Sequence, residues 1–228
     1  DMPRDTLTRQ IHHLLDEVLL LGSMVEQATL SAMDILRQRD LKAAAILYEN
    51  DQRINDKRFA IENAILILIA TQQPMAHDLR LLAAMLEIIT ELERMGDYAK
   101  GIAKVTLHLK DADINIPNRD LERMANQSVN MLHRGLSAFV NEDPNEASAI
   151  AGEDAVVDDL YIRIYRHLVE AMIANPVTID QYNQVMWVAH NLERMADRVT
   201  NICERTVFIA TGDMLEMDTT DDEESDGE

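Results

Sequence analysis

The sequence predicts an all-α protein, a tandem repeat of two three-helix bundles with six long antiparallel helices. Ala, Leu, Ile and Met are abundant, whereas aromatic residues make up 4% of the chain and Gly and Pro number 7 and 5, a composition that favours helix over sheet. Hydrophobic residues recur at spacings of three and four, which is the period of an amphipathic helix. The hydrophobic fraction of 47% is ample for a packed core.

Stop signals separate the first three helices. A first helix is expected from about residue 6 to residue 39. Asp40 can cap a second helix, which continues until Pro74 ends it. A third helix is expected to begin near Ala76, to extend past Leu107 and to stop at residues 111–117. These three helices form the first predicted bundle.

An irregular stretch at 111–117 predicts the link between the two halves. A fourth helix is expected over about 119–140. Asp143 then supplies an N-cap and Pro144 the first helical position of a fifth helix, which runs to Ala174.

Thr178 and Gln181 have the spacing of a capping box and open a sixth helix that ends shortly before Gly212. The remaining segment, 213–228, contains nine acidic residues and no Lys or Arg: Asp213, Glu216, Asp218, Asp221, Asp222, Glu223, Glu224, Asp226 and Glu228. Such a stretch buries too little apolar surface to fold, so we expect a disordered acidic tail.

The two halves repeat one another. The string Leu-Glu-Arg-Met-x-Asp occurs at 92–97 and again at 192–197, an offset of one hundred residues. Neighbouring features recur with nearly the same offset, as expected when the same helices and turns recur with small loop changes. The sequence therefore predicts a first repeat over 1–114 and a second over 115–212.

The repeated string places two carboxylates on one helix face in each half. Residues at i and i+4 lie above one another, so Glu93 projects beside Asp97, and Glu193 beside Asp197. Leu and Met in the string are most simply core contacts, whereas carboxylates need not recur merely to meet solvent. A cation would neutralise their mutual repulsion. Solvated acids on a helix face are the competing interpretation.

A second pair of oxygen-bearing residues accompanies each string. Asp51 and Asn55 stand at this spacing in the first repeat, and Asp154 and Asp158 in the second. If each hairpin folds antiparallel about its proline, arms of similar length bring the two pairs to nearly the same height. Four such side chains suit iron, manganese, magnesium or calcium, and also zinc.

The halves differ as metal sites. Asn201 and Glu204 extend the ligand row of the second repeat, whereas the third helix offers Gly101 and Lys104. Asn55 also replaces an acid in the first repeat. We therefore predict that the second repeat binds metal more strongly.

Other candidate sites are weaker. His190 lies three residues before the second string, but a histidine satisfied inside the bundle explains it more simply. Cys203, the single cysteine, is expected to be a small buried hydrophobe. The chain carries no phosphate-binding glycine loop, nucleophile elbow or zinc-finger spacing, so an enzyme is not expected. A ferritin-like di-iron protein uses Glu-x-x-His, which is absent here, and a metal-free helical scaffold is a further alternative.

Charge, apolar runs and cysteine usage limit the classes of partner and the cellular compartment that we expect. The formal net charge of -20 repels nucleic acid and anionic lipids and favours hard cations or partners with basic surfaces. The longest apolar run, 64–70, is far shorter than the ~20 residues of a membrane-spanning helix and predicts a buried helix segment. A lone cysteine and the lack of an apolar leader favour the cytoplasm.

The order of these motifs resembles the PhoU family of phosphate-uptake regulators. The resemblance rests on Asp51-x-x-Ile-Asn55, Gln73-Pro-Met-Ala-His-Asp-Leu-Arg80, Glu91-Leu-Glu-Arg-Met-Gly-Asp-Tyr-Ala99, Asn191-Leu-Glu-Arg-Met-Ala-Asp-Arg-Val-Thr-Asn-Ile-Cys-Glu204 and Thr211-Gly212. It covers essentially everything except the acidic tail. Asn55 stands where the family usually has Asp, and Gly101 where Asn is common.

The resemblance implies a multinuclear iron or zinc cluster held by the Glu/Asp-x-x-x-Asp motifs. It also implies an adaptor that restrains the ATPase subunit of the phosphate ABC transporter and quietens the sensor histidine kinase of the phosphate-starvation response. Such a protein is expected to be a cytoplasmic homodimer that reaches the inner membrane only through its partners.

Overall fold

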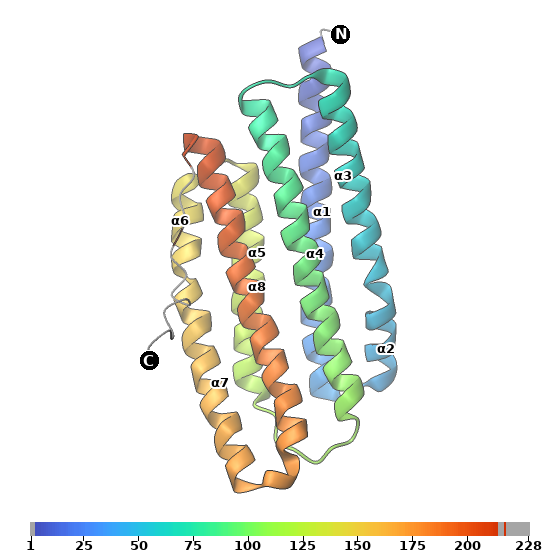
Figure 1. The fold of residues 1–228 in the computed structure, drawn as a ribbon, viewed down its shortest axis with the longest axis vertical. Coiled ribbons are helices and arrows are strands. Elements are labelled where there is room, and N and C mark those ends of the chain that lie inside the picture. Colours follow the sequence, from blue (N-terminus) through green and yellow to red (C-terminus); the bar gives the residue numbers. More distant parts are fainter. Residues whose placement is uncertain (1–2, 214–216, 218–228) are drawn as a thin grey trace, which may run out of the picture.

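The computed structural model describes residues 3–213 and 217. Long antiparallel helices, joined by short links, make up nearly all of this part of the chain (Figure 1). The predicted all-α class and its two repeats of three long helical arms are confirmed. The first repeat consists of α1 (Pro3–Gln38), α2 (Leu41–Asn50), α3 (Gln52–Gln72) and α4 (His77–Leu109). The second consists of α5 (Asn118–Val140), α6 (Pro144–Gly152), α7 (Asp154–Ala174), the 3-10 turn η1 (Pro176–Thr178) and α8 (Ile179–Thr211).

The middle arm of each repeat is broken, so the prediction of one continuous helix there was wrong. Asp51 separates α2 from α3, and Glu153 separates α6 from α7. Asp51 keeps helical angles (φ -55°, ψ -30°), whereas Glu153 (φ -77°, ψ -9°) lies near the bridge region. The chain therefore changes direction slightly without leaving the arm, and hydrophobic spacing alone does not reveal such a break.

The helix-end signals were mostly confirmed. The Asp40 side chain accepts a hydrogen bond from the amide of Ala43 (2.9 Å), and Asp143 caps α6 in the same way. Gly212 ends α8 in the left-handed region at φ 80°, where glycine is favoured. The capping box at Thr178 was wrong: its hydroxyl donates to the carbonyl of Asn175 (2.7 Å), because the chain makes a 3-10 turn before α8.

The repeats pack side by side, with α4 against α8 and α1 against α5 (Figure 1). Between α4 and α8, Glu91 meets Asn201 and Gly101 meets Asn191, as expected for antiparallel helices. These two contacts exchange under the hundred-residue offset. The repeats are therefore related by an approximate twofold axis.

One continuous hydrophobic core spans both repeats. Leu82, Leu132 and Val188 are fully buried in it, although they come from three different arms. Helix α1 is long and apolar enough to cross a membrane by length and composition, but its apolar stripe packs against α3, α4 and α5, as in the core helix of a bundle. The prediction that 64–70 is buried was only partly right, because Leu66 and Ile67 are 51% and 55% exposed.

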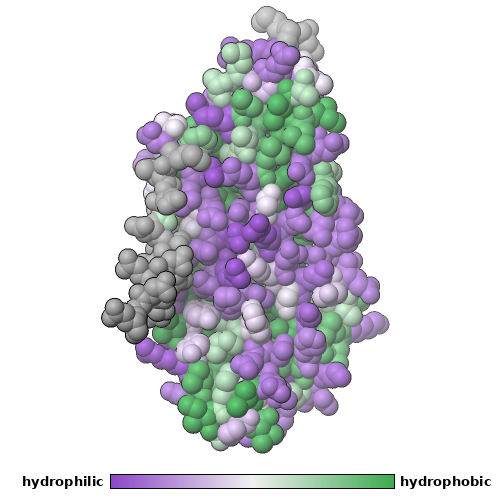
Figure 2. Space-filling view, viewed as in Figure 1, coloured by the Kyte–Doolittle hydropathy of each residue, from purple (hydrophilic) through white to green (hydrophobic). Residues whose placement is uncertain are grey.

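Exposed apolar side chains gather at the two hairpin tips. Met75, between α3 and α4, is 80% exposed, and Val177, in η1, is 88% exposed. Figure 2 shows hydrophobic residues toward both ends of the molecule and hydrophilic residues across its middle. The predicted tail, 213–228, lies outside the described residues except for Asp213 and Met217.

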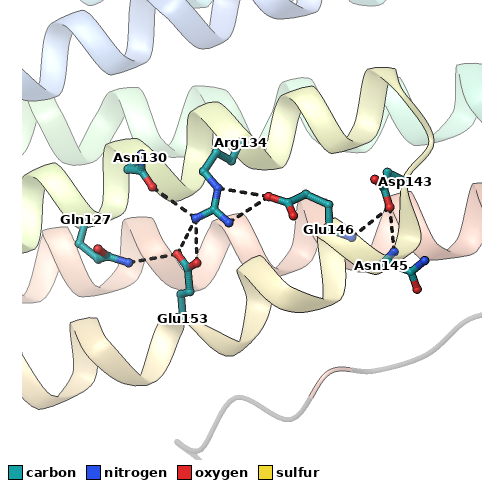
Figure 3. A network of polar contacts seen from close by, with 7 residues as sticks. All are labelled: Gln127, Asn130, Arg134, Asp143, Asn145, Glu146 and Glu153. Atoms are coloured by element: carbon teal, nitrogen blue, oxygen red, sulfur yellow. Dashed lines mark hydrogen bonds and ion pairs between the residues drawn. The ribbon is translucent and has the colours of Figure 1, made fainter.

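An arginine holds the broken arm of the second repeat in place (Figure 3). Arg134 of α5 donates to both carboxylate oxygens of Glu153, at 2.7 and 2.9 Å. It also donates to Glu146 of α6 at 2.9 Å. The two carboxylates raise the pKa of Arg134 through these hydrogen bonds. This clamp joins α5 to the α6–α7 break, directly beside Asp154.

Candidate metal centre

The helix breaks place one buried carboxylate in each repeat. Asp51 and Asp154 stand at the two breaks and are 5% and 9% exposed. A buried charge is costly unless it is paired, hydrogen-bonded or bound to a cation. These two aspartates therefore mark the polar interior of each repeat.

In the first repeat the predicted acids of α3 and α4 do come together. Burial raises the pKa of Asp97 above its ordinary value, and the negative charges of Asp51 and Glu93 raise it further. Gly96 allows the close approach of the two helices, because a Cβ there would lie 3.2 Å from Ile54 and 3.6 Å from an oxygen of Asp51. The break between α2 and α3 therefore faces the repeated string on α4.

The oxygen atoms of this cluster are poorly satisfied. Both carboxylate oxygens of Asp51 and the amide oxygen of Asn55 are buried and accept no hydrogen bond from any residue in the described part of the chain. Buried polar atoms are normally hydrogen-bonded, so orphaned oxygens indicate a missing partner. Oxygen donors of this kind fit a hard cation.

Two basic side chains of the protein already reach the first cluster. Lys100 Nζ lies 3.5 Å from Asp51 Oδ2, and Arg58 Nε lies 2.7 Å from Glu93 Oε2. Sequence reasoning missed both residues. The signal was present, because Arg58 follows Asp51 and Asn55 on the same helix face and Lys100 lies three residues after Asp97.

In the second repeat, α7 carries Asp154 and Asp158 and packs against α8, the helix that contains the second string. Neutral residues occupy the positions equivalent to the two bases: Tyr161 corresponds to Arg58, and Thr200 to Lys100. The second cluster therefore has less positive charge supplied by the protein at these positions.

The side chains of α8 around the second string differ in how far they are exposed to solvent. Glu193 is 15% exposed and lies 3.8 Å from the imidazole of His190. His190 itself is 36% exposed and contacts the rings of Tyr161 and Trp187, so it is half-buried at the edge of the bundle and not enclosed within it. Its pKa is lowered by burial and by the charge of Arg194.

The two C-terminal members of the predicted ligand row point elsewhere. Asn201 is rotated roughly 80° from Glu193 around the helix and donates to Glu91 of the other repeat (3.4 Å). Glu204 lies roughly 16 Å further along α8 than Glu193 and accepts a hydrogen bond from the amide of Met217 (2.8 Å). Both residues therefore have a polar contact of their own in this structure, and their place in the ligand row stays a prediction.

Within residues 3–213 and 217, no group of three or more Asp, Glu, His or Cys side chains is arranged to hold a metal ion. The donor chemistry of the first cluster fits a cation, whereas its present rotamers do not enclose one. Cys203 is no metal ligand here: it is fully buried, and burial raises the pKa of its thiol to about 12.

Comparison with known proteins identifies the fold and the family together. The PhoU domain model matches residues 18–106 and again residues 121–206. The chain belongs to the PhoU family. This match covers most of the chain and reproduces its two repeats.

Relatives across bacteria are similar over nearly their full length. The phosphate-specific transport system accessory protein PhoU homolog of Clostridium acetobutylicum is 33% identical over 95% of this chain and 99% of its own. The accessory protein PhoU of Escherichia coli is 33% identical over 89% of this chain and 84% of its own. The family comprises accessory and regulatory proteins and not enzymes.

Solved structures of PhoU superimpose closely. The phosphate transport system regulatory protein PhoU from Streptococcus pneumoniae matches with a TM-score of 0.87 and 31% identity, covering 92% of this chain and all of its own. PhoU from Pseudomonas aeruginosa matches with a TM-score of 0.84 and 27% identity, covering 90% of this chain and 99% of its own. The chain is a PhoU-like accessory protein of phosphate transport.

Proposed function

We propose that this protein is a metal-binding adaptor that lowers phosphate uptake by the phosphate ABC transporter and quietens the sensor histidine kinase of the phosphate-starvation response when phosphate is sufficient. The family membership supports the phosphate role. The observation that supports metal binding is the buried aspartate at each helix break, on an arm that packs against the helix carrying the Glu-x-x-x-Asp string. The chemistry would be coordination without turnover.

The proposed ligands follow the repeat. Asp154, Asp158, Glu193 and Asp197 would bind in the second repeat, with Asn201 and Glu204 extending a multinuclear iron or zinc cluster along α8. Asp51, Asn55, Glu93 and Asp97 would bind in the first. Rotation of the carboxylate side chains is required in both, because their present arrangement encloses no ion.

We further propose that the second repeat binds metal more strongly. In the first repeat Lys100 and Arg58 compete with a cation for Asp51 and Glu93. Their positive charges repel a divalent ion, and each lies next to one carboxylate oxygen that the ion could otherwise bind. Thr200 and Tyr161, at the equivalent positions, present no such charge.

Metal content of matched variants tests this proposal. The double variant Glu193→Gln with Asp197→Asn should lose most of the bound iron or zinc measured by elemental analysis of the purified protein. The matched variant Glu93→Gln with Asp97→Asn should lose less. Equal losses would contradict the asymmetry, and a wild-type protein that takes up neither ion in a calorimetric titration would contradict metal binding.

The adaptor role is tested separately. The full chain, used as bait in extracts of phosphate-replete cells, should recover the transporter ATPase subunit and the sensor kinase, and no nucleic acid. Recovery of neither protein would contradict the regulatory proposal whatever the metal content. We place the protein in the cytoplasm, bound at the inner membrane only through these partners. We expect a homodimer, which sedimentation velocity measures.

A further inference from the structure

A cluster of arginines lies where the first turn of α5 meets α7, in a chain whose net charge is -20. Two neighbouring hollows of about 530 and 460 Å³ occupy this place and share Arg163 as a lining residue. The basic residues that line them are Arg119, Arg123, Arg163, Arg166 and His167. The strongest local concentration of positive charge on α5 and α7 therefore surrounds a concave surface.

The acidic residues of the cluster do not neutralise it. Asp120 is the counterion of two arginines, at 3.4 Å from Arg163 and 3.8 Å from Arg123. Arg119 and Arg166 form no ion pair with any residue in 3–213 or 217. With Glu170 as the only other acid lining the hollows, the four guanidinium groups exceed the two carboxylates.

The fold does not require these basic residues. The first repeat has Ala60, Asn63 and Ala64 at the positions equivalent to the three basic residues of α7, which are 103 residues further along. The same arm thus packs in the first repeat without any positive charge on this face. The arginines are a property of the second repeat's surface and not of its packing.

We propose that this arginine pocket binds a phosphoryl-bearing anion with at least two negative charges. Guanidinium groups match phosphoryl oxygens through paired, charge-assisted hydrogen bonds. The N-cap residue of α5 is Pro117, whose side chain cannot accept a capping hydrogen bond, so the positive end of this 23-residue helix adds to the same field. The hollows are larger than a single phosphate and suit a diphosphate or a phosphate headgroup. The inference does not depend on the proposed metal clusters.

Calorimetric titration of the full chain with pyrophosphate and with inorganic phosphate, at low salt and in the presence of a chelator, tests this proposal. Arg163→Gln should weaken pyrophosphate binding by at least about tenfold, because a hydrogen bond to a charged group contributes roughly 1.5 to 3 kcal/mol and about 1.4 kcal/mol corresponds to a factor of ten. Arg4→Gln is the matched control. It makes the same charge change on the exposed start of α1, at the opposite end of the molecule (Figure 1), and should leave affinity unchanged.

A second variant separates binding from structure. Asp120→Asn removes the carboxylate that competes for two arginines, so it should tighten pyrophosphate binding several-fold. A merely structural ion pair would give no gain in affinity. Unchanged binding in both Arg163→Gln and Asp120→Asn would therefore overturn the proposal, as would wild-type binding that is measured in a parallel titration without chelator and is absent with it.

The source of the phosphoryl group is decided by a parallel experiment. Co-sedimentation with phosphatidic acid vesicles, compared with phosphatidylcholine vesicles, reports a lipid headgroup, whereas the titrations report a free anion. Arg163-dependent binding in either experiment supports the pocket. Absence of binding to pyrophosphate, inorganic phosphate and phosphatidic acid vesicles would overturn it.

Discussion

Single residues account for the difference between the two proposed metal clusters. Lys100 lies against the buried carboxylate of Asp51 in the first repeat, and Thr200 stands at the equivalent position in the second. The ammonium group lies next to one oxygen of this carboxylate and repels a divalent ion that binds to it. We therefore expect the residue at this one position to determine how favourable the free energy of cation binding is in each cluster.

Lys100→Thr should make the first cluster resemble the second in charge and in metal binding. In metal-free protein we expect a loss of roughly 2 kcal/mol in the free energy of unfolding, because Asp51 then remains buried without a counterion. Added Mn²⁺ or Zn²⁺ should restore the loss, as measured by urea denaturation with and without metal. Thr200→Lys is the reciprocal variant and should weaken metal binding in the second repeat. A Lys100→Thr protein that gains no stability from metal would contradict this assignment.

Asp97 makes the metal-free protein sensitive to pH. Burial and the neighbouring acids raise its folded pKa above the unfolded value of about 3.9. The folded state therefore takes up the proton first. The contribution of Asp97 to stability is fully present below about pH 3.9 and is lost as the pH rises through the raised folded pKa.

Asp97→Asn should accordingly stabilise the metal-free protein at pH 7.5 and change little near pH 3.5, where Asp97 is protonated in both states. Midpoints of urea denaturation at the two pH values, with a chelator present, measure this difference. If Asp97→Asn stabilised the protein more at pH 3.5 than at pH 7.5, the pKa of Asp97 would not be raised in the folded state.

At the scale of the helices, the broken arms depend on contacts between elements. Arg134 holds Glu146 of α6 and Glu153 of the break from a third helix, α5 (Figure 3). Arg134 makes two charge-assisted hydrogen bonds to each carboxylate, which is more than an ordinary surface ion pair provides. The clamp therefore fixes the direction in which α7, with its aspartates, leaves the break.

Arg134→Met should lower the free energy of unfolding by about 1 to 2 kcal/mol, since Arg134 is one-third exposed and the methionine retains the apolar part of the side chain. Amide hydrogen exchange over 144–156 should accelerate more than exchange over α5. Arg123→Met, on the exposed face of the same helix, is the control and should leave this exchange unchanged. Uniform acceleration along the chain would argue against a local clamp.

Glycines show how helix packing overrides local preference. A Cβ on Gly22 of α1 would lie 2.2 Å from Leu136 of α5, whereas a Cβ on Gly152 meets nothing within 4 Å. Gly22→Ala should therefore destabilise the protein by about 1 to 2 kcal/mol through the forced shift of a buried leucine. Gly152→Ala should stabilise it by about 0.5 to 1 kcal/mol through helix propensity alone. Thermal or urea denaturation with the same sign for both would contradict this argument.

Local signals in the sequence predicted helix ends well and breaks poorly. Pro74, Asp143 and Gly212 act on their own neighbours, so their effects could be read from the chain. The break at Asp51 has no proline or glycine at it, and the hydrophobic spacing continues through it. The cations that meet the predicted acids were missed because Arg58 and Glu93 belong to different helices, and only packing brings them together.

At the scale of the whole molecule, the two repeats share one core and one polar interface. Arg198 of α8 lies 3.2 Å from the hydroxyl of Tyr98 and 3.4 Å from Glu91, both on α4. Thr29 of α1 in the first repeat donates to the sulfur of Met195 of α8 in the second (3.6 Å). Although the sequence divides into repeats at the 111–117 link, neither half completes its hydrophobic surface alone.

We therefore expect the repeats to unfold together. Leu82→Ala in the first repeat and Leu132→Ala in the second each remove a fully buried side chain and should each cost about 2 to 5 kcal/mol. Because the core is continuous, each variant should shift one common transition, with circular dichroism and the fluorescence of Trp187 in the second repeat changing together. A segment of residues 115–212 expressed alone should lack cooperative unfolding, since the α8 face that packs on α4 would be exposed. If Leu82→Ala lowered the helical signal while leaving the tryptophan transition in place, the repeats would be independent folding units joined only by their link.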